Sequence, residues 1–160
     1  MGFMKQVQLT NGKIALIDDE DYDRVSALRW KEVGGYAAHN YTKAGKTHTL
    51  YMHRMITNAL VGMKVDHINH DALDNQKANL RVCTHAQNHM NRVKVSGTSS
   101  LYKGVTWNKA LGKWKAYISY EGKFRHIGYF DNEIHAAISY DLWSHALFGQ
   151  YALTNLTPAG

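Results

Sequence analysis

Apolar and polar positions alternate along much of the first fifty residues of the chain. One alternating stretch, residues 5–17, runs through the turn-forming TNG, and a second pair, GGYAAHNYT and THTLYMH, flanks KAGK. A period of two is typical of β-strands, so two β-hairpins are predicted. Between them, DDEDYDRVSALR places its acids first and Val25 and Leu28 three apart, which predicts a helix. A further short helix is expected over HRMITNAL.

Residues 65–92, VDHINHDALDNQKANLRVCTHAQNHMNR, combine regularly spaced apolar residues with many Asp, Asn and His side chains. KVDH and LRVC predict two short strands, and the loop between them contains the turn formers Asp74 and Asn75. In THAQNHMNR, Thr84 is a suitable N-cap and Gln87 completes a capping box, which predicts a helix. The expected order is therefore strand, long loop, strand and helix.

The last third of the chain predicts a small sheet with one helix. Residues 94–100, KVSGTSS, have the composition of a linker. Beyond them, LYKGVTWN, KWKAYISY and KFRHIGYF predict three strands, and a helix is expected from Asp131 to about Gly149. Apolar residues recur on this helix at helical spacing, at Ala136, Tyr140, Trp143 and Leu147. We expect the helix to cover the apolar face of the middle strand, formed by Trp114, Ala116 and Ile118.

Charge divides this last third in two. Residues 96–128 hold six Lys or Arg against one acid, Glu121, whereas residues 129–160 hold three acids and no Lys or Arg. The open face of the sheet is therefore expected to be basic, with an acidic helix behind it. Together with the net charge of +6, this indicates a polyanionic partner.

The single cysteine, Cys83, excludes an internal disulfide and is expected to be a small buried residue in a reduced intracellular protein.

The types of residue in the 65–92 stretch suit phosphodiester hydrolysis. Asp66 and His67 are adjacent at the end of a predicted strand, Asn79 closes the loop, and Asn88 lies in the predicted helix. Carboxylate and amide oxygens are hard ligands that suit Mg²⁺, and a neutral imidazole can take a proton from water. Only three acids occur in residues 63–95, so one metal ion is expected rather than two.

The segments MHRMI, VDHIN, LDNQKANLRV and AQNHMNR resemble the HNH nucleases, specifically the group found in phage and intron-encoded homing endonucleases. The resemblance implies the compact ββα-metal fold. It makes His67 the general base, Asp66 and Asn88 the metal ligands, and Asn79 the residue that holds the loop and orients the region of His67. Because Asn88 replaces the last histidine of the motif, the chain resembles the His-Asn-Asn variant, with His89 next to it.

Residues 101–156 resemble the AP2 DNA-binding domain through LYKGVTWN, GKWKAYI, HIGYFDNEIHAAISYD and LFGQYALTN. The resemblance implies a three-stranded sheet that lies in the major groove of DNA with a helix packed behind it. Nine residues of this segment are expected to contact DNA: Lys103, Thr106, Asn108, Lys113, Lys115, Tyr117, Ser119, Lys123 and His126. Arg92 is a further candidate, which either clamps a phosphate or ends a solvated helix.

The sequence as a whole predicts an α+β protein. Residues 1–93 are expected to hold N-terminal strands and the nuclease domain, with its core motif at 64–92; residues 94–100 form a linker and 101–156 an AP2-like domain. The predicted function is a Mg²⁺-dependent (or Mn²⁺-dependent) DNA endonuclease of the homing type, with one ion in each active site. Its expected partner is double-stranded DNA, bound as a monomer or a DNA-assembled dimer in the cytoplasm of a bacterial or phage-infected cell, with no membrane association and no small-molecule cofactor.

Other interpretations of the same residues stay open at this point. His67, His70, His85 and His89 are candidates for a structural zinc site without cysteine. A non-catalytic DNA-binding regulator with a relic nuclease module is the main alternative function. His53 is expected to be a packed or hydrogen-bonded structural residue rather than a catalyst.

Overall fold

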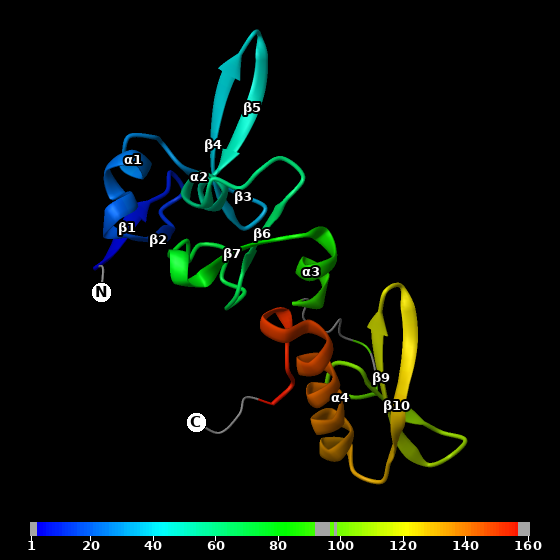
Figure 1. Cartoon of the computed structure of the whole chain (residues 1–160). Coiled ribbons are helices and arrows are strands. Elements are labelled where there is room, and N and C mark those ends of the chain that lie inside the picture. Colours follow the sequence, from blue (N-terminus) through cyan, green and yellow to red (C-terminus); the bar gives the residue numbers. More distant parts are fainter. Residues whose placement is uncertain (1–2, 92–96, 98, 157–160) are drawn as a thin grey trace. The chain divides into compact units, whose positions relative to one another are not determined.

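The N-terminal part of the chain folds as short antiparallel strands and helices in a computed structural model, which describes residues 3–91, 97 and 99–156. β1 (Met4–Gln8) pairs with β2 (Ile14–Asp18), which confirms the first predicted hairpin. β4 (Tyr36–Lys43) pairs with β5 (Lys46–Tyr51) as the second, and β3 (Lys31–Val33) joins β4 on its other edge. The 3₁₀-turn η1 (Asp19–Asp21) and the helix α1 (Tyr22–Ser26) follow β2 (Figure 1).

The elements expected from residues 53–83 are also present. α2 (Met52–Thr57) is the short helix, and it ends at Asn58, whose φ of 49° is left-handed. β6 (Lys64–His67) pairs with β7 (Leu80–Cys83), and the 3₁₀-turn η2 (Lys77–Asn79) lies directly before β7. The helix predicted over residues 18–29 is shorter than expected, because the acids at its start form η1 and the α-helix ends at Ser26.

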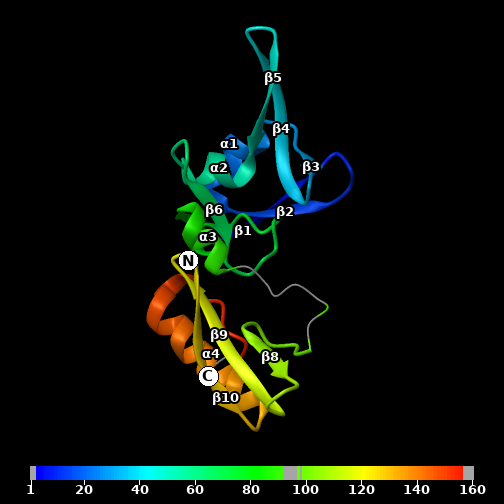
Figure 2. The same cartoon turned by 90° about the vertical axis from the view of Figure 1, so that its right-hand side faces the viewer.

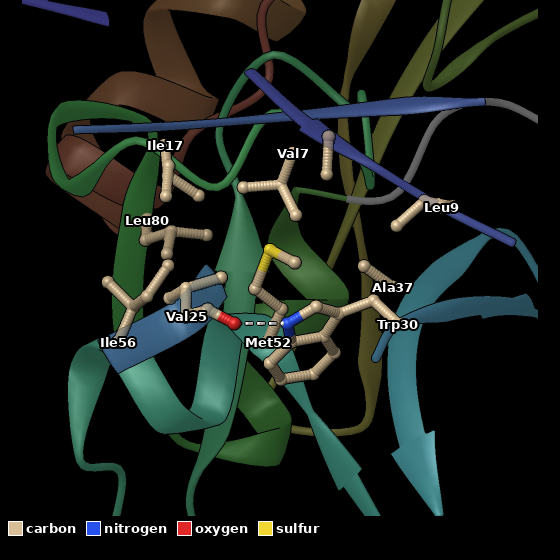
Figure 3. Close-up of a cluster of buried hydrophobic side chains, with 10 residues drawn as sticks. Val7, Leu9, Ile17, Val25, Trp30, Ala37, Met52, Ile56 and Leu80 are labelled. Carbon is tan, nitrogen blue, oxygen red and sulfur yellow. Dashed lines mark hydrogen bonds between the residues drawn. The ribbon is translucent and has the colours of Figure 1, made fainter. Parts of the chain in front are cut away.

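A single apolar core holds these elements together. It gathers residues from β1, β2, α1, β4, α2 and β7 and from the loops after β1 and α1: Val7, Leu9, Ala15, Ile17, Val25, Trp30, Ala37, Met52, Ile56 and Leu80. Burial of a Val, Leu, Ile or Met side chain stabilises a fold by roughly 1.5–3 kcal/mol. Trp30 is 1% exposed, and its indole N–H donates to the carbonyl oxygen of Val25 at 2.8 Å (Figure 3).

The outer part of the β4–β5 hairpin extends away from this core (Figures 1 and 2). Every residue from 40 to 49 is exposed. Tyr41 stacks on His48 across the strands with ring centroids 5.4 Å apart, and the Thr49 hydroxyl donates to the Asn40 amide oxygen at 3.1 Å. Both faces of the hairpin are therefore polar or aromatic and open to solvent.

The second part of the chain contains the predicted sheet and helix. β8 (Val105–Asn108), β9 (Lys113–Tyr120) and β10 (Lys123–Phe130) form an antiparallel sheet in the order β10-β9-β8. α4 (Glu133–Phe148) packs on this sheet and is capped by Asn132, whose side chain accepts from the backbone N–H of Ile134 at 2.7 Å. Ala116 and Ile118 are buried under the helix, as the alternation in β9 predicts. The 3₁₀-turn η3 (Gly149–Tyr151) follows α4, and the helix α3 (His85–Met90) precedes the sheet in the chain.

The buried stripe of α4 differs from the predicted one at Trp143, which is 42% exposed. The stripe consists of Ala136, Ala137, Tyr140, Ser144 and Phe148, a spacing of three to four residues. Trp143 precedes Ser144, and adjacent helix positions point about 100° apart, so it turns to the outer side.

The chain divides into two compact units, Met1–His85 and Ala86–Gly160. The expected linker at 94–100 falls mostly outside the described residues, so the predicted domain bounds stay predictions. None of the helices in the described ranges has both the length and the apolar character needed to cross a membrane.

Gly104 is a glycine that the second unit requires, because its φ is +72° and a Cβ there would lie 2.0 Å from Cδ2 of Tyr140. Its carbonyl oxygen also accepts from the N–H of Tyr117 at 2.8 Å. Gly112 offers a matched control, since its φ of +60° is similar but a Cβ would meet nothing within 4 Å. An alanine in this left-handed conformation destabilises the fold by roughly 1–2 kcal/mol at either site, and the clash at Gly104 adds about 1–3 kcal/mol.

We therefore expect Gly104→Ala to lower the free energy of unfolding clearly more than Gly112→Ala, as measured by urea unfolding of the full chain. Equal losses in the two variants would contradict the tight packing of Gly104 against Tyr140.

Candidate active site

The strand pair β6–β7 places the two residues expected to do the chemistry side by side. Asp66 and His67 end β6, and the register sets them opposite Arg81 and Leu80 of β7. Asp66 is 8% exposed and His67 is 6% exposed. A carboxylate and an imidazole are thus both withdrawn from water at the end of one strand.

Arg81 forms an ion pair with the buried carboxylate of Asp66. Its Nε and Nη2 atoms lie 2.8 and 2.6 Å from Oδ2 of Asp66. A buried carboxylate needs a cation nearby to stay ionised, and the guanidinium group provides one. A divalent ion bound to Asp66 would therefore share the carboxylate with Arg81 or displace it.

Asn79 ties together the loop that connects β6 to β7. Its side-chain oxygen accepts from the N–H of Asn69 at 2.9 Å, and its side-chain NH₂ donates to the carbonyl oxygen of Asp74 at 2.8 Å. Its own carbonyl oxygen accepts from the N–H of Ile68, the residue after His67, at 2.9 Å. Asn79 therefore fixes the backbone of the residues that follow His67. A direct effect of Asn79 on catalysis stays a prediction.

The environment of His67 keeps its imidazole neutral near pH 7. Burial lowers the pKa of His67, and the side chain of Asn75 and the carboxylates of Asp66, Asp74 and Asp71 act against this lowering. Asn75 is 0% exposed and approaches the imidazole, although its amide oxygen lies outside good hydrogen-bond geometry. A neutral imidazole beside a carboxylate is suited to accept a proton from water.

The buried position of Asn75 is a feature that the sequence did not reveal, since it was predicted only as a turn former. The backbone N–H of Asn75 donates to the carbonyl oxygen of Leu16 at 2.7 Å, and the N–H of Leu16 donates to the carbonyl oxygen of Leu73 at 2.8 Å. The loop is thereby fastened to β2, which brings Asn75 inward. A pairing between residues this far apart leaves no mark in a local turn pattern.

Two rings, Tyr36 and His53, lie against His67, Tyr51 packs on both of them, and none of the three was predicted to belong to the site. Tyr36, His53 and Tyr51 come from β4, α2 and β5. His53 is 8% exposed, and burial, with smaller effects from His67 and Arg54, lowers the pKa of His53 to about 4. His53 is therefore neutral at physiological pH.

The other expected metal ligand, Asn88, lies on α3 in the second unit together with His89. The structure thus brings Asp66, His67 and Asn79 together, and the participation of Asn88 stays a prediction. Within the described ranges, no three His, Cys, Asp or Glu side chains gather as a metal-ligand set. Asp66 fits a divalent ion as a buried carboxylate, and the remaining ligands would have to be amide or water oxygens.

The open face of the β8–β9–β10 sheet is a second candidate site. A hollow of about 460 Å³ is lined by Thr106, Lys115, Tyr117, Phe124, Arg125 and His126. Phe124 and Arg125 were not among the predicted contacts, although Phe124 is 79% exposed. Ser119 is exposed on the same face. Lys123 is exposed too, but it pairs with Tyr120 and so points to the other side of the sheet, contrary to the prediction.

Several other predicted DNA contacts have partners within the chain. The ammonium group of Lys113 lies 3.2 Å from Asp131, and Asn108 accepts from the N–H of Leu111 at 3.1 Å. Lys103 donates to the carbonyl oxygen of Met90 at 2.7 Å, and burial lowers the pKa of Lys103 to about 8. Arg92 lies outside the described residues.

The segment of this chain that matches a known protein family includes the residues of the first candidate site. Residues 51–90 match the HNH endonuclease family model. Over 150 residues the chain is 29% identical to a protein of Acanthamoeba polyphaga mimivirus named as an uncharacterized HNH endonuclease, a match that covers 90% of this chain and 75% of that protein. A second protein of the same virus, named only as uncharacterized, is 34% identical over 71 residues, which are 42% of this chain and 21% of that protein.

The lowered pKa of His53 predicts how the stability of the fold responds to acid. In the unfolded chain a histidine titrates near 6.5, so between pH 6.5 and about 4 the unfolded state binds more protons than the folded state. The stability that the neutral His53 contributes to the fold is fully present above pH 6.5 and is lost as the pH falls towards 4. By this linkage, the free energy of unfolding should fall by about 2 kcal/mol more in wild-type protein than in His53→Phe protein when the pH is lowered from 7 to 4.5.

Urea unfolding at the two pH values measures this difference. His48→Phe is the control, because His48 is exposed on the hairpin and should leave the pH dependence unchanged. Equal acid losses in wild-type and His53→Phe protein would show that His53 titrates normally in the fold.

Proposed function

We propose that this protein is a metal-dependent DNA endonuclease in which His67 accepts a proton from the water that attacks a phosphodiester. One observation carries the proposal: within the segment that matches the HNH family, a buried neutral imidazole adjoins a buried carboxylate at the end of β6. General-base catalysis of this kind typically contributes 10²–10⁴-fold to the rate.

Each residue of the site has a distinct part in this mechanism. Asp66, with Asn88 as a second ligand, would hold a divalent ion, for which Mg²⁺ or Mn²⁺ is the expected choice. When bound, such an ion supplies positive charge to the phosphate and to the leaving oxygen. Asn79 holds the loop that follows His67, and the neutral imidazole takes the proton of the attacking water.

The charge of residues 33–65 supports a polyanionic substrate at this site. From residue 33 to residue 65 the chain carries Lys43, Lys46, Arg54 and Lys64 and no Asp or Glu. This segment includes the exposed β4–β5 hairpin and leads directly into Asp66. A phosphate backbone approaching from this side meets no opposing carboxylate in the segment.

The second unit is proposed to bind DNA as an AP2-like module and to supply sequence preference, as in a homing-type enzyme. Lys115 is suited to phosphates, while Thr106, Tyr117, Ser119 and His126 offer hydrogen-bonding groups on the same open face. Lys123 pairs with Tyr120 in the register and so lies on the other side of the sheet. Phosphate contacts set affinity, and contacts to base edges set preference.

A non-catalytic DNA-binding regulator is the second candidate function. The ion pair between Arg81 and Asp66 favours it, because a carboxylate already neutralised by a guanidinium has less affinity for a metal ion. The two functions differ in whether the chain breaks DNA in the presence of a divalent ion.

Cleavage of supercoiled plasmid in Mg²⁺, with and without EDTA, separates the two functions. We expect nicked or linear product from wild-type protein in Mg²⁺, at least 10²-fold less from His67→Ala, and severe loss from Asp66→Ala. His70→Asn is the matched control, since His70 is exposed in the adjacent loop and its left-handed φ of 65° tolerates Asn. Near-normal cutting by folded His67→Ala would exclude His67 as the base.

The open sheet face gives a separate prediction about binding. Lys115→Ala should weaken binding to specific and scrambled duplexes equally and reduce the salt slope by about one, whereas Lys123→Ala, on the other side of the sheet, should have a smaller effect. His126→Ala should instead reduce the difference between the two duplexes, because its ring can reach base edges. Binding titrations at several salt concentrations measure these effects, and unchanged affinity in both Lys115→Ala and His126→Ala protein would show that DNA does not bind this face.

A further inference from the structure

The imidazole of His67 lies against two other rings that come from distant parts of the chain. His53 approaches it edge to face, with ring centroids 5.2 Å apart and an interplanar angle of 87°. Tyr36 lies at 5.8 Å with an angle of 45°. Both distances fall in the range in which aromatic rings attract each other with a preferred geometry. His67 therefore contacts two rings, each at a different interplanar angle.

Tyr51 completes this group of rings. It stacks on His53 at 5.5 Å and 15°, and it meets Tyr36 edge to face at 6.1 Å and 79°. Tyr36 and His53 also touch each other, at 5.3 Å and 66°. Each of the four rings thus contacts at least two of the others, so no ring can turn without disturbing its neighbours. We call Tyr36, Tyr51 and His53 the ring cluster.

The ring cluster joins separate elements to the strand that carries the base. Tyr36 is the first residue of β4 and Tyr51 the last of β5, so both stand at the foot of the hairpin. His53 lies in the first turn of α2, whose residue Met52 is buried in the apolar core. The rings are therefore anchored on elements that the core fixes in place.

His53 meets His67 through its ring rather than through its Nδ1 atom. Its Nδ1 atom is buried and has no hydrogen-bond partner among the described residues. A buried nitrogen without a partner destabilises a fold, and phenylalanine would pack a similar ring there without that cost. The neutral state of His53 also means that it does not repel His67 when His67 takes up a proton.

We propose that His53 and Tyr36 are positioning residues, whose rings fix the plane of the His67 imidazole for proton transfer. This inference rests on the proposed function, in which His67 is the general base. Proton transfer requires the imidazole nitrogen to point at the attacking water, and a catalytic group must be held to within about 10–20°. His53 and Tyr36 contact the His67 ring at different interplanar angles and also touch each other, which meets that requirement without binding substrate.

Paired substitutions at His53 separate ring geometry from bulk. His53→Phe and His53→Leu both remove the unpartnered nitrogen, but only phenylalanine keeps a ring edge against His67. Under single-turnover conditions in Mg²⁺ we expect His53→Phe to cleave within about threefold of the wild-type rate. His53→Leu should be about 10–100-fold slower with unchanged DNA affinity, because small misplacements of a catalytic group cost up to 10²-fold.

The same comparison applies at Tyr36. Tyr36→Phe keeps the ring and should cleave at nearly the wild-type rate, whereas Tyr36→Leu should be slower without losing affinity. His39→Leu is the matched control, since His39 makes an edge-to-face contact with Trp30 at 6.1 Å outside the ring cluster. Urea unfolding of each variant confirms that slow cleavage is not caused by unfolding.

Two results would overturn the proposal. Cleavage by His53→Leu at the rate of His53→Phe would show that the ring does not position His67. Equal loss in both variants would show that the nitrogen, not the ring, is what the reaction needs.

NMR of the His67 side chain gives a readout independent of cleavage. The ring signals of His67 should stay near their wild-type positions in His53→Phe and move in His53→Leu and Tyr36→Leu, because neighbouring rings shift the resonances of the groups they face. If wild-type protein did not cut DNA, the proposed function would fail, while these spectra would still decide whether the ring cluster holds His67. Unchanged His67 signals in both Leu variants would refute the positioning role.

Discussion

The register between β6 and β7 is the constraint on which the candidate active site depends. It sets Asp66 opposite Arg81 and His67 opposite Leu80. A slip of one residue would turn every side chain of β6 to the other face. Such a slip would separate Asp66 from the guanidinium that neutralises it, and a buried carboxylate without a cation is strongly unfavourable. The ion pair therefore helps to select the register that also buries His67.

The loop between the two strands is held by a different set of interactions, which come from the start of the chain. A carboxylate oxygen of Asp18 accepts from the N–H of Lys77 at 2.7 Å, and the ammonium group of Lys77 pairs with Glu20 and Asp21. With the bridge between Leu16 and Asp74, these contacts fasten the loop to β2 and η1. The acids of residues 18–21 thus have a structural use on one side of the unit, and the segment 33–65 is left without any acid.

Local patterns in the sequence predicted most of the elements, with β3 as an exception, but not which side chains of distant elements meet near His67. The TNG and KAGK turns, the strands KVDH and LRVC, and the alternation in β9 all report local backbone geometry, and the structure has them. The positions of Asn75, Tyr36 and His53 near His67 depend on which faces of distant elements meet, which periodicity does not encode. Trp143 shows the same limit on a smaller scale: spacings of three and four both fit a helix, and only packing against the sheet decides which residues are buried.

These observations together suggest why the hairpin and the site occur in one unit. The foot of the hairpin carries Tyr36 and Tyr51, which belong to the ring cluster. Its outer part exposes two lysines and one stacked pair of rings: Lys43, Lys46, Tyr41 and His48. A hairpin of two strands is only marginally stable by itself, so β4 and β5 depend on the core at their foot for a fixed direction. The same packing that fixes the foot of the hairpin therefore also brings Tyr36 against His67, the residue proposed as the base.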